Sequence, residues 1–311
     1  MIRTDLAVEA REMHGEGISG VISRTEKRSG AEVTTVEITS PDGAKRLGKP
    51  MGMYVTVEIE DAESPDGRKA AAESLASELK LMMEGKDASR VLVVGLGNDH
   101  ITPDSVGVAA AERVFVTRHL RELMPEEFAA AREVSSIAPG VLGLTGIETG
   151  ETVRGVAEKI KPTLIIAVDA LASRSMSRIG STLQLTDTGI SPGSGVGNSR
   201  RELSEKTLGV PVIAVGVPMV ADAATVADDA ISMLIGKMKE EAEGSSDEVM
   251  KMLSGMEEND RYALIYEALE PKSANMFVTP KDVDAIADRV SEILRNGLNS
   301  ALHGNKYEIF Y

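Results

Sequence analysis

The sequence of 311 residues contains no cysteine and no tryptophan, and only 3% of its residues are aromatic. Without cysteine the chain can form neither a disulfide framework nor a thiolate zinc site. The low aromatic content removes the stacking platforms on which proteins bind single-stranded nucleic acids. The chain also lacks a run of about 18 apolar residues, so we expect no membrane span. The first ten residues carry charges where a signal peptide would be apolar, which predicts a cytoplasmic protein.

Positive charge is scarce as well. The chain has 34 basic and 49 acidic residues, and its formal net charge is -15. This balance opposes attraction to phosphate backbones and anionic membranes, so we expect neither nucleic acid nor membrane as a partner. The four histidines are scattered and no His-x-x-x-His pair occurs, so a dedicated zinc site is poorly supported. We therefore expect no metal and no cofactor.

Apolar, β-branched runs alternate with helical patterns through the middle of the chain. Such alternation is typical of βαβ units, and it predicts a three-layer α/β/α fold with a mostly parallel central sheet. The expected strands cover residues 91–96, 164–169, 182–187 and 211–217, and the expected helices cover about 105–122, 126–132, 151–160 and 222–242.

The two ends of the chain follow different patterns. Residues 33–38 and 53–59 alternate in polarity, which predicts an antiparallel, hairpin-like N-terminal addition. Ser64-Pro-Asp-Gly opens a long helix to about Gly85, and Thr279-Pro-Lys-Asp282 is expected to cap a C-terminal helix. We predict one domain over 1–311, with a β-rich addition at 1–62, an α/β core at 63–243 and a helical part at 244–311.

Two aspartates each follow an apolar run. Asp104 comes after residues 91–94 and ends the stretch Gly-Leu-Gly-Asn-Asp-His-Ile-Thr-Pro-Asp, while Asp169 comes directly after residues 164–168. In open α/β sheets, ligands bind at the carboxyl ends of the strands. One such aspartate is more often a helix cap or a turn residue than a catalyst. Two at one sheet edge could share a proton and activate water, which predicts an acid-dependent hydrolase.

Two glycine-rich segments are candidates for shaping the site. Gly95, Gly97 and Asn98 follow a strand as in a dinucleotide fingerprint, but the third glycine is missing, so a tight turn that presents the next loop is the better account. The second segment covers residues 186–198, with Asp187 near its start and Gly193-Ser194-Gly195 at its centre. It is either an ordinary turn or a main-chain surface that holds a peptide or orients water. Asp187 could belong to the site or cap the turn.

Two further side chains, Ser194 and His100, lie in or near these segments. Ser194 lacks the strand, Gly-x-Ser-x-Gly and helix context of a serine nucleophile, so serine hydrolysis is weakly supported. His100 is the histidine nearest to a candidate acid.

Many sequence blocks, in order, resemble the germination protease family of spore-forming bacteria. The blocks include Ile-Arg-Thr-Asp-Leu-Ala-Val-Glu at the N-terminus, Thr-Pro-Asp104 and Val-Asp169-Ala. The others cover residues 94–98, 116–120, 138–140, 145–149, 187–190, 192–198 and 209–214. This resemblance implies an endopeptidase that degrades small acid-soluble spore proteins when a spore germinates.

The resemblance also implies further properties. The family is an atypical aspartic peptidase with a fold similar to that of hydrogenase-maturation endopeptidases, and its two essential aspartates correspond to Asp104 and Asp169. It implies a homotetramer, a zymogen and a place in the spore core. Two departures stand out: Ser191 replaces a histidine of some relatives, and only Met1 precedes the first block, where the family has a short pro-segment. The second departure leaves autoprocessing of this chain open.

Two alternatives to an aspartate pair remain at this point. One is a metal-dependent endopeptidase of the hydrogenase-maturation type, whose activity would be lost in chelator and restored by one added metal. The other is a non-catalytic module that binds a peptide or a nucleotide. Binding of an intact spore protein without cleavage would support that second alternative.

Overall fold

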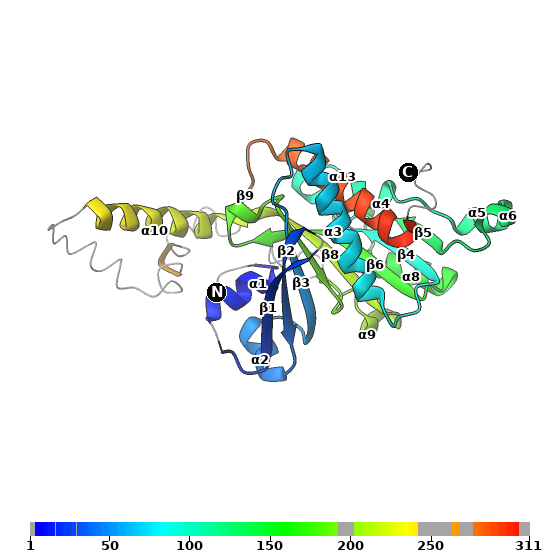
Figure 1. The fold of residues 1–311 in the computed structure, drawn as a ribbon, viewed down its shortest axis with the longest axis horizontal. Helices are drawn as coiled ribbons and strands as arrows, with labels where there is room; N and C mark the ends of the chain where they lie inside the picture. The colour runs from blue at the N-terminus through cyan, green and yellow to red at the C-terminus, as the bar shows by residue number, and fades with distance from the viewer. Residues whose placement is uncertain are drawn as a thin grey trace.

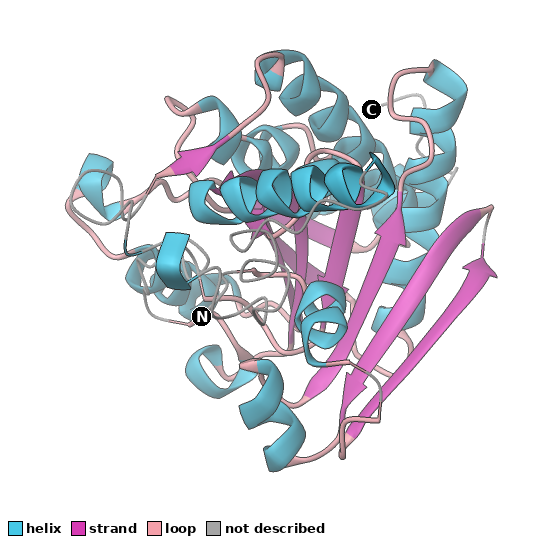
Figure 2. Cartoon of the chain, turned by 90° about the vertical axis from the view of Figure 1, so that its left-hand side faces the viewer, coloured by secondary structure: helices cyan, strands magenta, loops and turns pink. Residues whose placement is uncertain are grey.

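The protein is a mixed α/β structure built on one large sheet. The computed structural model describes residues 4–15, 17–28, 30–191, 202–241, 263–265, 267 and 276–304. Within these residues nine strands form the sheet, in the order β1-β2-β3-β7-β8-β6-β4-β5, with β9 paired to β8 (Figures 1 and 2). The strands are β1 (Val21–Arg28), β2 (Ala31–Ile38), β3 (Gly52–Glu58), β4 (Arg90–Gly95), β5 (Glu133–Ile137), β6 (Leu164–Ser173), β7 (Thr182–Thr186), β8 (Val212–Asp222) and β9 (Phe277–Val278).

Strand orientation corrects the prediction of a mostly parallel sheet. Only the β4–β5, β4–β6 and β6–β8 pairs of the described sheet are parallel, and its other pairs are antiparallel. Strand β7, expected inside a βαβ unit, is antiparallel to both β3 and β8. The connection from β6 to β7 over residues 174–181 contains only one 3-10 turn, η2 (Met176–Arg178). A parallel crossover needs a dozen or more residues, so this connection reverses the chain direction instead.

The N-terminal strands belong to the same sheet. Residues 33–38 pair antiparallel with residues 52–57, as predicted, and β3 continues into the core sheet by pairing with β7. The N-terminal strands are therefore joined to the core by strand pairing rather than attached beside it.

The helices agree with the sequence patterns in part. The described helices are α1 (Ala7–His14), α2 (Pro41–Leu47), α3 (Pro65–Met83), α4 (Val106–Glu112), α5 (Arg118–Leu123), α6 (Pro125–Phe128), α7 (Leu142–Thr145), α8 (Thr149–Ile160), α9 (Glu205–Leu208), α10 (Ala223–Glu241) and α13 (Val283–His303). Helix α3 begins as predicted: the Ser64 hydroxyl accepts from the Gly67 N–H at 3.0 Å, and Pro65 occupies the first helical position. Figure 1 shows α10 extending away from the body of the molecule.

Three helix predictions were wrong in detail. The helix expected over 105–122 is interrupted between α4 and α5, because the Thr117 hydroxyl accepts from the Val134 N–H at 3.0 Å and ties this part of the chain to β5. The helix expected over 126–132 is only the short α6, and β5 follows. Helix α13 begins at Val283 with Asp282 at the N-cap position, while the Thr279 hydroxyl donates to the Met219 carbonyl at 3.1 Å. The linker predicted near residue 244 lies outside the described residues.

Alternate residues of each strand point to opposite faces of the sheet. We call the face toward which Leu164, Ile166 and Val168 point the α3/α13 face, because α3, α4 and α13 bury it (Figure 1). We call the opposite face, toward which Ile165 and Ala167 point, the cavity face. Helices α1, α2 and α8 pack on parts of this second face. No helix in the described part of the chain is both long and apolar enough to cross a membrane.

Candidate active site

Strand β6 extends past the end of its neighbour β4. The last pair of the β4–β6 ladder joins Gly95 to Val168, and the Leu96 N–H then donates to the Val168 carbonyl at 2.8 Å. Asp169 is the next residue of β6. It therefore lies inside a strand that continues to Ser173, and not at the end of a strand over 164–169 as predicted. Residues 170–173 lack the β-branched pattern that marks a strand, but pairing with β8 keeps them extended.

A tight loop after β4 carries Asp104. The Asp104 N–H donates to the Ile101 carbonyl at 2.7 Å, and the Asp104 carbonyl accepts from the Asn98 N–H at 3.1 Å. Gly97 has a φ of +115°, and a Cβ placed there would lie 1.9 Å from the Asp104 carbonyl oxygen. At Gly95 a Cβ would lie 2.3 Å from the Gly107 carbonyl of α4. The two glycines therefore let the chain approach closely enough to present Asp104, which agrees with the tight-turn interpretation.

Asp104 and Asp169 line one cavity of about 550 Å³. Asp169 is 5% exposed and its carboxylate accepts from the Ala170 N–H at 3.0 Å, whereas Asp104 is half-buried. In the sheet, Asp169 is paired with Gly216 of β8, which also lines the cavity. The absent side chain of Gly216 leaves room for Leu171 of β6, since a Cβ placed at Gly216 would lie 2.5 Å from the Leu171 side chain. A buried and a half-buried acid on one cavity is the arrangement expected for acid/base hydrolysis.

The other predicted site residues take varied positions. The Asp187 carboxylate accepts from the Met53 N–H at 2.9 Å and so holds the start of β3, outside the cavity lining. Gly193, Ser194 and Gly195 lie outside the described residues, although the preceding Ser191 lines the cavity. The side chain of His100 is 73% exposed and lies 3.8 Å from that of Asp99, away from the cavity.

Several polar side chains of the cavity were missed by sequence reasoning, and four of them matter most here. Asp5, Lys49, Tyr54 and Gln184 all line it. Burial lowers the pKa of Lys49, and the carboxylates of Asp5 and Glu9 oppose that shift. Burial raises the pKa of Tyr54 to about 12, while a hydrogen bond from Thr188 opposes the change. These residues come from the N-terminal segment, the residues before β3, β3 itself and β7. The pairing of β3 with β7 and the position of residues 4–7 bring them together.

Metal-binding potential can be assessed over the described residues. Among them, no group of three or more histidine, aspartate or glutamate side chains is placed to hold a metal ion.

Comparison with known proteins identifies the family of the chain. The family model described as germination protease matches residues 2–248 and 237–308. The chain belongs to the germination protease family. It is 48% identical to the germination protease of Clostridium acetobutylicum, over 97% of this chain and 95% of that protein. The germination proteases of Clostridium tetani and Bacillus subtilis are 44% and 40% identical, each over 97% of this chain and over 95% and 94% of the relative. Membership in the germination protease family implies a peptidase that acts in spore germination.

Proposed function

We propose that the protein is an endopeptidase that cleaves small acid-soluble spore proteins, with Asp104 and Asp169 as its catalytic pair. The observation that carries this proposal is that both aspartates line one cavity. Asp104 lies in the loop after β4, and Asp169 lies in β6, the strand that pairs with β4 up to Gly95. Membership in the germination protease family supports a peptidase, and the resemblance in the blocks around both residues supports this choice of acids.

The cavity supports a mechanism in which the two acids divide the work. One carboxylate, ionised, takes a proton from water, and the resulting hydroxide attacks the carbonyl carbon of the scissile peptide. The other carboxyl group, protonated, donates to the carbonyl oxygen and stabilises the tetrahedral intermediate. The intermediate then collapses with cleavage of the C–N bond: the second carboxyl group takes its proton back, and the first gives the proton from water to the leaving amine. Two neighbouring carboxylates resist simultaneous ionisation, so the pair holds one proton over a range of pH and titrates as a unit.

Substitution of each acid tests the proposal. We expect Asp104→Asn and Asp169→Asn each to abolish cleavage of a purified small acid-soluble spore protein while the melting temperature stays within a few degrees. The matched control is Asp99→Asn, because Asp99 lies in the same loop, is 58% exposed in its side chain and does not line the cavity. Full activity in either cavity variant would overturn the assignment. Loss of wild-type activity in chelator, with recovery on addition of one metal, would favour metal-dependent hydrolysis instead.

The resemblance also supports proposals about assembly and maturation. We propose a homotetramer and synthesis as a zymogen, as in the family that the sequence resembles. Sedimentation of the purified protein would test the first, and N-terminal sequencing of the protein before and after activation would test the second.

A further inference from the structure

An extended piece of the chain itself lies along the wall of the candidate active site. The Lys49 ammonium nitrogen donates to the Thr4 carbonyl at 2.9 Å. The side-chain amide of Gln184 donates to the Asp5 carbonyl at 3.0 Å and accepts from the Ala7 N–H at 2.7 Å. All three contacts reach main-chain groups, which every peptide carries whatever its sequence. Lys49 and Gln184 are thus placed to hold a polypeptide backbone.

The same piece of chain is bonded to the strand that carries Asp169. The Asp5 N–H donates to the Ala172 carbonyl at 2.8 Å, and the Asp5 carboxylate accepts from the Ala172 N–H at 2.9 Å. Beyond Gly95 strand β4 no longer pairs with β6, so main-chain groups of β6 can bond an added segment. Addition of an extended peptide beside a strand is a common mode of peptide binding. We call Lys49, Ala172 and Gln184 together the main-chain track.

Strand register sets the distance from the track to the candidate catalytic acid. Gln184 of β7 is paired with Gly216 of β8, and Gly216 is paired with Asp169 of β6. Neighbouring strands lie about 4.8 Å apart, so the Cα atoms of Gln184 and Asp169 are separated by about 10 Å. An extended peptide covers that distance in about three residues. A backbone held by Gln184 therefore reaches Asp169 within a short stretch of substrate.

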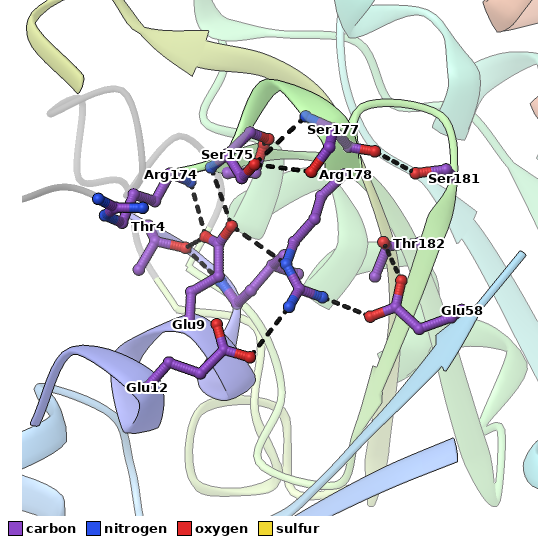
Figure 3. A network of polar contacts seen from close by, with 12 residues as sticks. Thr4, Glu9, Glu12, Glu58, Arg174, Ser175, Ser177, Arg178, Ser181 and Thr182 are labelled. Carbon is purple, nitrogen blue, oxygen red and sulfur yellow. Dashed lines mark hydrogen bonds and ion pairs between the residues drawn. The ribbon is translucent and has the colours of Figure 1, made fainter. Parts of the chain in front are cut away.

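The N-terminal segment is fixed in this position by a buried network around Glu9. The Glu9 carboxylate accepts from the Arg174 N–H at 2.6 Å, from the Ser175 N–H at 3.0 Å and from the Thr4 hydroxyl. Figure 3 shows these three contacts converging on Glu9. Arg178 lies 3.4 Å from the same carboxylate. These contacts keep Thr4 beside Lys49. The fixed segment therefore displays how a peptide backbone can contact Lys49.

We propose that Lys49 and Gln184 bind the main chain of the peptide substrate, in the positions at which they hold Thr4 and Asp5 here. The inference rests on the proposed endopeptidase function and adds two binding residues to it. A substrate segment takes the place of Thr4 and Asp5, which requires that these residues first break their bonds to Glu9 and Ala172. The carbonyl groups of the substrate then accept from Lys49 and from the Gln184 amide. Lys49 keeps an N–H donor whether or not its amine is protonated. Binding through the backbone holds the peptide without restricting the side chains that flank the scissile bond.

Binding to an inactive protein tests the track separately from catalysis. We would measure the Kd of a purified small acid-soluble spore protein for the Asp104→Asn protein, alone and with Lys49→Met or Gln184→Leu added. To displace Thr4 and Asp5 the substrate must hold these donors more strongly than they do, so loss of a donor raises Kd. We expect increases of up to about tenfold for Lys49→Met and up to about fivefold for Gln184→Leu. Lys45→Met is the matched control, because Lys45 is an exposed lysine of α2 that does not line the cavity, and its Kd should stay unchanged. Unchanged Kd in both track variants would overturn the inference.

A second measurement uses protein with Lys49 and Gln184 unchanged. It therefore does not depend on whether the Lys49 and Gln184 variants fold. Gln184 is the only glutamine in the sequence, so selective 15N-glutamine labelling gives one side-chain amide signal. We expect this signal to shift when the Asp104→Asn protein is saturated with spore protein, and no shift would overturn the inference. Cleavage by the Asp104→Asn protein would overturn the proposed function instead. In that case KM would be measured for the active protein with Lys49→Met or Gln184→Leu added. An increase in KM would show that Lys49 and Gln184 bind substrate, and an unchanged KM would show that they do not.

Discussion

The two faces of the central sheet differ in what they bury. On the α3/α13 face, the side chains between sheet and helices are apolar, and Leu79, Leu294 and Leu298 among them are fully buried. On the cavity face, the same strands bury Asp169 and Gln184 beside an open volume of about 550 Å³. Full burial of one large apolar side chain contributes about 1.5 to 3 kcal/mol, whereas a buried polar group costs free energy unless it is hydrogen-bonded.

This difference indicates a division between stability and chemistry. The α3/α13 face supplies close packing that holds the strands in register. The cavity face can then keep acids, an amide and a hollow at positions that a folding core would fill with apolar side chains. Substitutions on the two faces should therefore affect different measurements, and the following predictions test that separation from the largest expected effect to the smallest.

Gly97→Ala should reduce cleavage by about a hundredfold, because a Cβ 1.9 Å from the Asp104 carbonyl must displace the loop that carries this acid. Steady-state kinetics with a spore protein would measure the loss as a fall in kcat. Gly155→Ala is the matched control, since a Cβ there meets nothing within 4 Å and the residue lies in α8. Equal activity of the two variants would show that the position of the Asp104 loop does not limit the reaction.

Leu79→Ala should lower the free energy of unfolding by about 3 kcal/mol, because the side chain is fully buried on the α3/α13 face. Urea denaturation would measure this loss. At a temperature where the variant stays folded, kcat should equal that of the wild type. Leu81→Ala on the same helix is the control, since Leu81 is 46% exposed and its loss should cost much less. A large fall in kcat for folded Leu79→Ala would break the separation of the two faces.

Tyr54→Phe should cost about 1 kcal/mol, because it removes the bond from the phenol to the Pro50 carbonyl, which is 2.9 Å long. The raised pKa of Tyr54, about 12, means that the folded state favours the neutral phenol. Its contribution to stability is therefore complete below the ordinary pKa of 10 and is lost as the pH rises toward 12. Phenolate absorbance should show a late-ionising group that Tyr54→Phe lacks. Ionisation of Tyr54 together with exposed tyrosines would contradict its burial in the cavity.

Local sequence patterns predicted those features that depend on neighbouring residues. The cap at Ser64 located α3, and the glycines around Leu96 indicated the tight turn before Asp104. Strand direction is not contained in such patterns: residues 182–187 are equally compatible with a parallel or an antiparallel strand. The connection over 174–181 decides the direction of β7, and it was too short for the crossover that we expected.

Side chains brought together by strand register were the least predictable part of the site. In the sequence, Gln184 is one polar residue of an alternating strand and Lys49 is one basic residue of a loop, so neither stands out as a site residue. Their shared role follows only from the pairing of β3 with β7 and from the position of residues 4–7. The two aspartates could be singled out because each follows a strongly apolar run, which is a local signal.

The most direct test of the central claim is a crystal structure with a peptide analogue whose scissile bond is replaced by a hydroxyl-bearing group. We expect the hydroxyl oxygen to lie between Asp104 and Asp169, within hydrogen-bond distance of both carboxyl groups, as the attacking water would. A hydroxyl bound away from either aspartate, or coordinated to a metal ion, would contradict the account.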